Sequence, residues 1–359
     1  MHIMHLRPIT NSRRTLFPAL TFSLYLRCLL ALGGLVALQS CGPKMLSNNP
    51  LAQKIRAGAV ARLSDTVNTA SLDYAPVVMP DGKRLYFISD REGSMATESK
   101  PDAKPRPSHD FWFVDVLNDN ANLFSRAVNA DTSHTYGAKS LNTAQNEGGG
   151  TYCQATRELY FTGCNRPGGF GDCDIYAVKL NANGEWGEVR NLGIIVNSGN
   201  WESQPAISPD GLTLLFASNR IRTDIKELLG NRELPIRLWC ATRKSVTEEW
   251  GTPFYVPELN PGGKNWSPFI CADGKTLIFA SDAPGGFGGL DFLISERGAD
   301  GKWSKPENIG EPLNTDEDES FISIPARGNV LYFSARNRAS YYSTRSMDIH
   351  IMRLPSVAP

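Results

Sequence analysis

Short apolar runs separated by turn residues recur along most of the chain. In ESQPAISPDGLTLLFASNR, which begins at Glu202, two apolar runs flank Pro-Asp-Gly, a combination typical of a tight turn between antiparallel strands. Long stretches of helical periodicity are absent, and Gly, Pro, Asn, Asp and Ser are scattered between the runs. The pattern therefore predicts many short strands joined by tight turns.

The same phrase recurs, which makes the chain a repeat protein. Copies begin at Asp73 and Asn265, and weaker copies begin at Glu147 and Glu319. A third apolar segment follows each copy and, outside the copy from Glu202, it opens with an aspartate: Asp110, Asp174, Asp291 and Asp348. In three copies a fourth segment starts near an aromatic residue: Trp186, Trp250 and Trp303. Each repeat thus predicts four strands.

Four-stranded units repeated in this way predict an all-β protein with a β-propeller fold over residues 61–354. Five blades fit the repeat, and six blades are the less favoured alternative. The last copy lacks a fourth segment before the short tail 355–359, whereas the stretch from Arg62 matches the end of a fourth strand. We therefore expect an N-terminal strand to complete the last blade and close the ring.

The N-terminal segment predicts a secretory signal. Arginines precede an apolar run over residues 29–38, and the run ends in LQSC, which resembles the lipobox of bacterial lipoproteins. This resemblance implies a signal peptide over residues 1–40, a lipid such as palmitate on Cys41, and a linker over residues 41–60. The alternative is an uncut anchor, but the run is short against the ~20 residues that a membrane-spanning helix needs.

The phrase SPDG-x-x-L-x-F-x-S-x-R, with its downstream aspartate strand, resembles the propeller repeats of the TolB type, distant relatives of WD40 repeats. RPGGFGDCDIY from Arg166 and APGGFGGLDFL from Ala283 resemble a variant common in Bacteroidota lipoproteins, including components of type IX secretion. The resemblance covers roughly residues 61–354. Many relatives carry an OmpA-like peptidoglycan-binding domain after the propeller, and the chain ends before one, which weakens the expectation of a direct wall-anchoring role.

The acid that opens each repeat is expected to face the arginine that closes it, because the two ends of a hairpin lie side by side. The expected ion pairs are Asp73 with Arg91, Glu147 with Arg166, Glu202 with Arg220, and Glu319 with Arg336 or Arg338. Asn265 and Ala283 replace both partners in the remaining copy, as a structural pair predicts. Independent roles for the acids and the arginines are the alternative.

A catalytic interpretation of these acids is the rival. Two carboxylates roughly 5–9.5 Å apart hydrolyse glycosidic bonds in many enzymes, and some five-bladed propellers are glycosidases. A catalytic pair is expected once, however, whereas these acids recur in every copy but one. We therefore expect structural roles, no catalytic residues and no enzyme activity, with a glycan-binding or glycan-cleaving channel as the alternative.

Charge and composition exclude several kinds of partner. Removal of residues 1–40 takes four arginines from the 37 basic residues and leaves 33 against 37 acidic ones, so nucleic acid is not an expected partner. The histidines after residue 40, His109, His134 and His350, lie on separate segments. We therefore expect no metal site and no cofactor.

The cysteines predict one disulfide. Cys164 ends the second strand of its repeat and Cys173 precedes the third. Outside the cytoplasm such a pair is readily oxidised, and the bond would add up to ~3 kcal/mol of stability. Cys153, Cys240 and Cys271 lie at apolar strand positions, where we expect them to pack as small buried side chains.

The loops between blades predict a binding face. Loops that join the second strand to the third, and one blade to the next, emerge on one side of a propeller and carry Phe170, Trp201, Trp266, Phe287, Tyr341 and Tyr342. Aromatic loops on a rigid scaffold suit protein or peptide recognition. The sequence thus predicts a lipid-anchored outer-membrane protein that faces the periplasm and binds an envelope protein or peptide, with peptidoglycan or another glycan as the open alternative.

Overall fold

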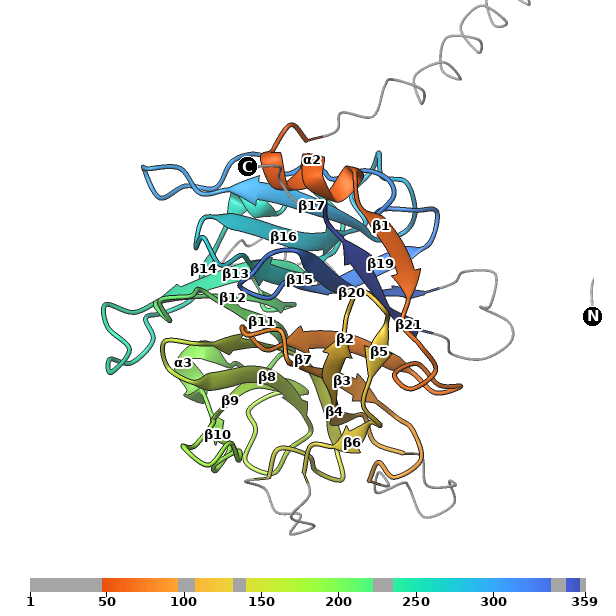
Figure 1. Ribbon diagram of the computed structural model, residues 1–359. Helices are drawn as coiled ribbons and strands as arrows, with labels where there is room; N and C mark the ends of the chain where they lie inside the picture. The colour runs from red at the N-terminus through yellow and green to blue at the C-terminus, as the bar shows by residue number, and fades with distance from the viewer. Residues whose placement is uncertain (1–46, 96–106, 132–139, 222–234, 337–346, 356–359) are drawn as a thin grey trace, which may run out of the picture. The chain divides into compact units, whose positions relative to one another are not determined.

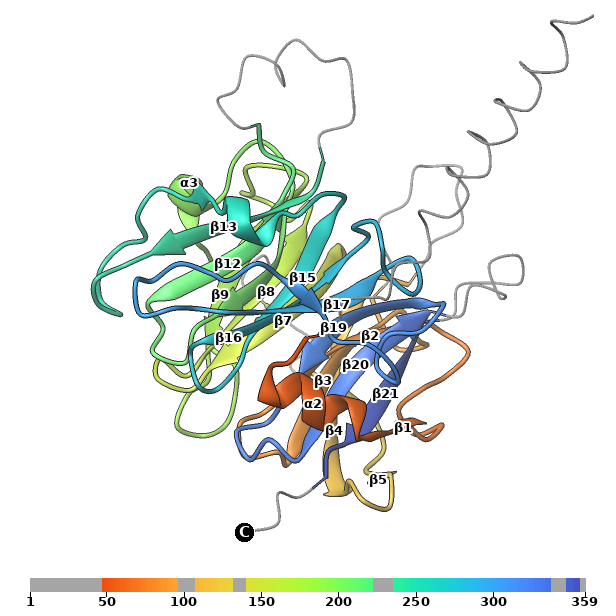
Figure 2. The ribbon, with the colours of Figure 1, turned by 90° about the horizontal axis from the view of Figure 1, so that it is seen from above.

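The computed structural model describes residues 47–95, 107–131, 140–221, 235–336 and 347–355. These residues form five antiparallel sheets, which are arranged as the blades of a β-propeller (Figures 1 and 2). The expected all-β fold with five blades is confirmed. No helix in the described ranges is long and apolar enough to cross a membrane.

In blades 1 to 4 the strands follow one another in the order of the sequence. Blade 1 contains β2 (Asp73–Val78), β3 (Arg84–Ser89) and β4 (Asp110–Asn118), with β5 (Leu123–Phe124) and β6 (Val128–Asn129) both paired to β4. Blade 2 contains β7 (Asn146–Cys153), β8 (Glu158–Cys164), β9 (Cys173–Lys179) and β10 (Arg190–Asn191). Blade 3 contains β11 (Glu202–Ile207), β12 (Thr213–Ser218), β13 (Arg237–Thr242) and β14 (Phe254–Tyr255).

Blade 4 contains β15 (Asn265–Ile270), β16 (Thr276–Ser281), β17 (Asp291–Glu296) and β18 (Glu307–Asn308). Blade 5 contains β19 (Asp318–Ser323), β20 (Val330–Arg336) and β21 (Met347–Arg353), and its outer strand is β1 (Ala59–Arg62). Two short helical segments, α3 (Gly193–Val196) and η1 (Pro257–Leu259), lie in the connections to the next blade.

The N-terminal strand closes the ring as the repeat predicts. β1 pairs with β21 in antiparallel register, from Ala59 opposite Arg353 to Arg62 opposite His350. Helix α2 (Pro50–Arg56) precedes β1. The helix begins at Pro50 because the side chain of Asn49 accepts hydrogen bonds from the first N–H groups and proline suits the first helical position. Both elements extend into the stretch 41–60 that the sequence analysis assigns to a linker; Figures 1 and 2 show them beside β21.

The core is divided among the blade junctions. At each junction the buried apolar side chains come chiefly from two neighbouring sheets. Successive residues of one strand serve opposite junctions: in β8, Phe161 packs against blade 1 and Tyr160 packs against blade 3. This explains why the second strand of a blade is largely apolar along its length, as in β12 and β16, since sheets covered on both faces bury both sets of side chains.

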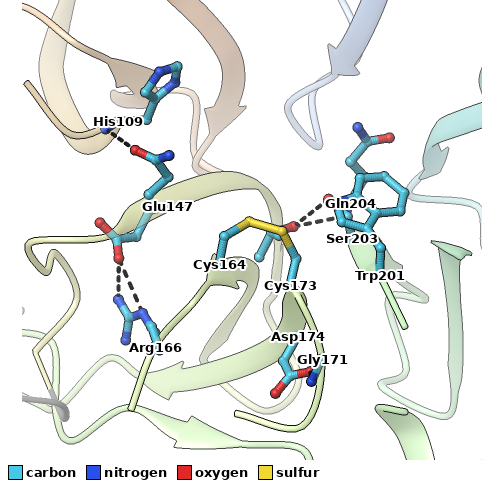
Figure 3. Close-up of a disulfide and its surroundings, with 12 residues drawn as sticks. His109, Glu147, Cys164, Arg166, Gly171, Cys173, Asp174, Trp201, Ser203 and Gln204 are labelled. Carbon is cyan, nitrogen blue, oxygen red and sulfur yellow. Dashed lines mark hydrogen bonds and ion pairs between the residues drawn. A yellow bond between two sulfur atoms is a disulfide. The ribbon is translucent and has the colours of Figure 1, made fainter. Parts of the chain in front are cut away.

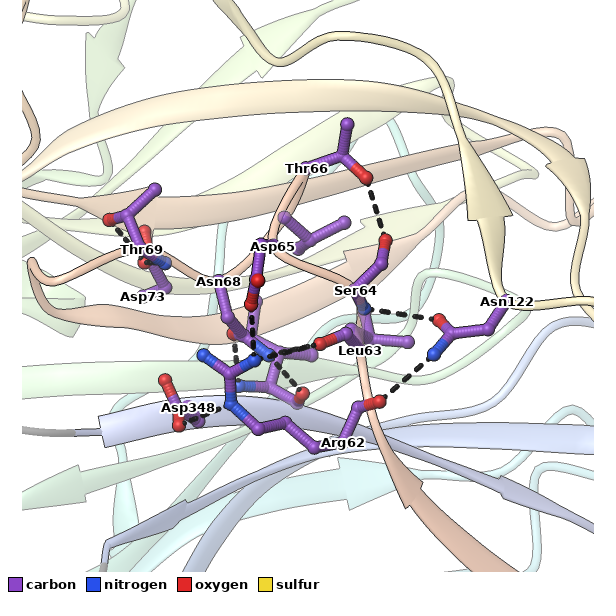
Figure 4. Close-up of polar contacts among 12 residues, drawn as sticks. Arg62, Leu63, Ser64, Asp65, Thr66, Asn68, Thr69, Asp73, Asn122 and Asp348 are labelled. Atoms are coloured by element: carbon purple, nitrogen blue, oxygen red, sulfur yellow. Dashed lines mark hydrogen bonds and ion pairs between the residues drawn. The ribbon is translucent and has the colours of Figure 1, made fainter.

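An asparagine side chain joins each blade to the preceding one. Asn68 accepts a hydrogen bond from the backbone N–H of Ile349 at 2.8 Å and donates one to its carbonyl at 2.8 Å, which fastens the ring closure (Figure 4). The other blades repeat the arrangement with Asn142 on Phe111, Asn197 on Ile175, Asn260 on Leu238, and Asn314 on Phe292. The sequence analysis missed this feature, although an asparagine stands five residues before the opening residue of every repeat.

Ion pairs reinforce the closure. Arg62 Nε lies 2.7 Å from Asp348 Oδ2, and the amide of Asn122 donates to the carbonyl of Arg62 at 3.0 Å (Figure 4). Asp348 opens the third strand of blade 5, so this repeated aspartate holds the outer strand that the N-terminus supplies.

Replacement of Asn68 by alanine is expected to weaken the ring closure. The substitution leaves the buried N–H of Ile349 without a partner and removes one of the two hydrogen bonds to its carbonyl, which keeps the N–H of Leu63. We expect a cost of about 1–3 kcal/mol of unfolding free energy. Urea denaturation of the purified propeller measures the loss. Asn183→Ala, in an exposed turn, is the control and should stay within about 0.5 kcal/mol of the parent. Equal stability of the two variants would contradict the role of Asn68.

Candidate binding site at the channel mouth

The acids and arginines that frame three of the repeats lie in contact. Arg91 Nη2 is 2.5 Å from Asp73 Oδ1, Arg166 Nη2 is 2.9 Å from Glu147 Oε1, and Arg220 Nη2 is 3.1 Å from Glu202 Oε1. All three carboxylate residues are at most 1 % exposed. Figure 3 shows the pair in blade 2.

Each pair also binds the loop that leads into its blade. The carboxylate of Glu202 accepts hydrogen bonds from the N–H and the hydroxyl of Ser198, four residues earlier. Arg220 donates to the carbonyl of Val196, six residues before the acid. Equivalent bonds hold the loops before blades 1 and 2, through Thr69, Val67, Thr143 and Leu141. A buried charge with this many partners serves structure.

The expected pair of Glu319 with Arg336 does not form. Glu319 lies opposite Ala335 in the β19–β20 ladder, and Arg336 lies opposite Asp318 with its side chain exposed. In blades 1 to 3 the arginine lies two or three residues after the residue that faces the acid across the hairpin. Arg336 lies only one residue after Ala335, which faces Glu319. Arg338 is outside the described residues.

Glu319 is consequently a buried carboxylate without an arginine among the described residues. It accepts hydrogen bonds from the N–H and the hydroxyl of Thr315. Burial raises the pKa of Glu319 to about 7, and these hydrogen bonds oppose the increase only in part.

The aspartates that open the third strands hold loops. The carboxylate of Asp174 accepts the N–H groups of Phe170 at 2.7 Å and Gly171 at 3.2 Å, and Asp291 accepts the N–H of Phe287 at 2.9 Å (Figure 3 for blade 2). Asp110 accepts hydrogen bonds from Ser108 and Asn129. The acids that motivated a catalytic interpretation are therefore engaged inside the blades.

The central channel is closed by residues of the inner strands. A bulge in β2, β11, β15 and β19 places Ala75, Gln204, Ser267 and Phe321 in the left-handed region, with φ between 48° and 55°. Their side chains and Gly149 of β7 surround a cavity of only about 20 Å³. Residues of all five inner strands line this cavity, so it lies on the axis of the ring.

Phe321 and Gly149 form the tightest part of this closure. A β-carbon added at Gly149 would lie 2.5 Å from Cε1 of Phe321. The phenyl ring of Phe321, in blade 5, therefore occupies the space that a side chain at position 149 of blade 2 would need. Gln204 Oε1 accepts the N–H of Ser267 at 2.7 Å and completes the barrier.

A pocket of about 490 Å³ opens on one side of this barrier, with Gln204, Ser267 and Phe321 in its floor. Its walls include Tyr74, His109 and Trp266; the hydroxyl of Tyr74 lies 2.8 Å from Nδ1 of His109. Its charged residues are Lys264, Asp282, Asp318 and Arg336. We refer to this cavity as the mouth pocket.

Two carboxylates line the mouth pocket, and both accept backbone hydrogen bonds. Asp282 Oδ1 lies 2.5 Å from the N–H of Lys264, and Asp318 Oδ1 lies 3.2 Å from the N–H of Leu290. Neither belongs to the repeated acids, since Asp318 immediately precedes Glu319 and Asp282 follows the end of β16.

The predicted aromatic residues are distributed over the loops. Trp266 lines the mouth pocket, whereas Trp201 is half-buried against the junction of blades 3 and 4. Phe170 is 45 % exposed and Phe287 is half-buried. Tyr341 and Tyr342 lie outside the described residues. The sequence analysis missed Tyr74, His109 and Phe321. Tyr74 could have been found, because it directly follows the opening residue of its repeat, as the predicted Trp266 does.

A disulfide joins Cys164 of β8 to Cys173 of β9, which lie opposite each other in the ladder (Figure 3). The thiols of Cys153, Cys240 and Cys271 are buried. Burial raises the pKa of Cys240 to about 12, as an enclosed thiol requires. Cys41 is outside the described residues, and within these no group of three potential metal ligands occurs.

Comparisons with known proteins identify the fold. No family model and no curated protein matches the chain. Among solved structures, a thermostable family-43 glycoside hydrolase has a TM-score of 0.52 at 12 % identity, over 83 % of this chain and 97 % of that one. A putative TolB from Agrobacterium tumefaciens has a TM-score of 0.44 at 16 % identity, over 82 % and 83 %. At 12 % identity, the likeness to the glycoside hydrolase indicates a similar fold only.

Gly149→Ala is expected to destabilise the closed channel. The new methyl group collides with Phe321 and costs about 1–3 kcal/mol of unfolding free energy. In a Phe321→Ala background the same substitution should cost less than about 0.5 kcal/mol, since the colliding ring is absent. A double-mutant cycle by urea denaturation measures this coupling, and additive effects would show that the two residues do not meet.

The stability of the protein is expected to fall between pH 4.5 and about 7 through Glu319. Its pKa is higher in the folded state than the ordinary value of 4.5, so folding takes up a proton in this range and the folded state loses stability as pH rises. Glu319→Gln should remove on the order of 2 kcal/mol of this dependence. Unfolding free energies from pH 4 to 8 provide the test, with exposed Glu249→Gln as the control. Parallel curves for parent and Glu319→Gln would contradict the assignment.

Proposed function

We propose that this protein is a non-catalytic scaffold whose mouth pocket binds a segment of a partner protein or peptide. The observation that carries the proposal is the form of the pocket: a closed floor, aromatic walls and charged residues of both signs. Aromatic walls anchor apolar side chains, and polar groups around them fix the register of a bound chain.

The engagement of the carboxylates supports the absence of catalysis. The repeated acids are buried and bonded to arginines or to loop residues, and the pocket acids Asp282 and Asp318 accept backbone N–H groups. A general acid needs a carboxyl that is accessible and protonated near its working pH.

Hydrolysis or binding of a glycan is the second candidate, because Tyr74 and Trp266 offer rings on which a sugar stacks.

The N-terminal sequence supports an envelope location for this scaffold. The apolar run followed by LQSC resembles a lipoprotein signal, which would anchor Cys41 in a membrane. We propose the periplasmic side of an outer membrane, and the TolB-type repeats with their Bacteroidota-like glycine loops favour a partner in secretion or envelope assembly. Protease treatment of intact cells should leave the propeller undigested.

Trp266→Ala is expected to reduce partner capture at least about tenfold, because aromatic side chains at the centre of an interface often contribute 2 kcal/mol or more. Capture is measured by crosslinking in intact cells, followed by quantification of the proteins that parent and variant retain. Phe254→Ala, which removes an exposed ring at the outer edge of blade 3, is the matched control and should capture as the parent does. Cleavage of aryl glycosides by the parent, lost in Asp282→Asn or Asp318→Asn, would replace the scaffold by an enzyme.

A further inference from the structure

Blade 4 departs from the repeat at several positions of one network. Asn265 replaces the buried acid, Ala283 replaces the arginine, and Pro261 replaces the threonine or serine four residues before the acid. The side chain of Asn265 accepts the Ser281 hydroxyl at 2.8 Å, so the hairpin is still closed by a neutral bond. The loop before blade 4 therefore lacks the arginine that binds the equivalent loop of blades 1 to 3.

A cavity of about 490 Å³ lies at this loop. Asn260, Gly262, Gly263 and Asn265 line it, and they belong to the segment that an arginine holds in the other blades. Lys264 and Asp282 line both this side cavity and the mouth pocket. The two cavities are therefore adjacent. The altered positions of blade 4 lie beside the side of the mouth pocket at which an extended ligand would continue outward from the axis of the propeller.

The charges around the two cavities are unequally engaged. The carboxylates of Asp282 and Asp318 accept backbone hydrogen bonds. By contrast, the exposed side chains of Lys264 and Arg336 form no hydrogen bond or ion pair with the described residues. Arg237 of blade 3 also lines the side cavity, but its guanidinium lies over the ring of Tyr255 and has a further interaction. The exposed cations without such contacts therefore stand on blade 4 and blade 5, at two places around the mouth pocket.

Two enclosed polar atoms in the pocket wall add to this imbalance. Trp266 Nε1, which only donates, and Ser320 Oγ have no hydrogen-bond partner in the described part of the chain. Buried polar groups without partners are uncommon and destabilising. A ligand that presents acceptors here, with small adjustments of the wall, would relieve this deficit.

We propose that the partner segment is an extended acidic peptide that runs from the mouth pocket into the side cavity of blade 4. Its carboxylates bind Lys264 and Arg336, and an apolar side chain between them packs against Trp266 and Phe321. This inference rests on the proposed peptide scaffold and adds the charge of the peptide and its path.

Fluorescein-labelled octapeptide pools test the charge. Each pool has Phe, Leu or Trp at a central position and flanks of Asp/Glu, Asn/Gln or Lys/Arg, with an amidated C-terminus. By fluorescence anisotropy at roughly 50 mM NaCl, the acidic pool should bind about tenfold more tightly than the Asn/Gln pool, the value expected for two partly exposed ion pairs. The preference should shrink at roughly 300 mM NaCl because salt screens these pairs.

Charge variants locate the effect. Lys264→Gln and Arg336→Gln should each reduce the preference for the acidic pool, and together they should bring the ratio close to one. Exposed Lys305→Gln and Arg126→Gln are the matched controls and should keep the ratio of the parent. Equal binding of the acidic and neutral pools to the parent, or tighter binding of the basic pool, would overturn the inference.

Reconstruction of the repeat tests the path. Pro261→Ser, Asn265→Glu and Ala283→Arg together install in blade 4 the serine, acid and arginine that form the network of blade 3. This variant should fold with undiminished stability, because it restores the bonds of its neighbours, and it should bind the acidic pool at least about tenfold more weakly because the new arginine occupies the side cavity. Parent-like binding by the folded variant would remove the side cavity from the path.

Binding of the peptide pools, compared with binding of an oligogalacturonate, separates this inference from the proposed function on which it rests. If none of the peptide pools binds but an oligogalacturonate, a glycan rich in carboxylates, does bind, then the peptide scaffold and the acidic peptide both fail. If the neutral peptide pool binds as well as the acidic one, the peptide scaffold stands and only the acidic specificity fails.

Discussion

The ring depends on one repeated interaction, an asparagine side chain that binds both backbone groups of a residue in the third strand of the preceding blade. Apolar side chains fill the junctions between blades, and other hydrogen bonds, such as those from the N–H of Ala75 to Ser334 and from the N–H of Gln204 to Thr162, also cross between neighbouring blades. The paired hydrogen bonds set the relative position of neighbouring sheets, and Asn68 performs this task across the ring closure.

The asparagine also stands at a fixed distance before the strand that lines the channel. Five residues after it, the inner strand begins, with a buried acid in most blades, and the bulge two residues later turns Gln204, Ser267 and Phe321 toward the axis. The same repeat that stabilises the ring thus builds the floor of the mouth pocket. Where the acid and arginine are missing, in blade 4, a cavity adjoins that pocket.

Local relationships in the sequence were sufficient for the blades, the ring closure and the contacts of Asp73, Glu147 and Glu202, because the two ends of one hairpin are near in sequence and in space. Position 336 failed as the partner of Glu319 because the arginine has to lie two or three positions beyond the residue opposite the acid, and Arg336 lies only one position beyond Ala335. Turn spacing does not determine this detail of register. Phe321 against Gly149 was not predictable, since the two residues belong to blades 5 and 2 and meet only at the axis. The side cavity depends on the same three-dimensional arrangement.

The structure of the protein bound to a tightly binding member of the acidic peptide pool tests the central claim most directly. Our account predicts an extended peptide above Phe321 that enters the side cavity of blade 4, with carboxylates within hydrogen-bonding distance of Lys264 and Arg336. A peptide bound on the outer edge of the blades, or a mouth pocket that remains empty in the complex, would contradict it.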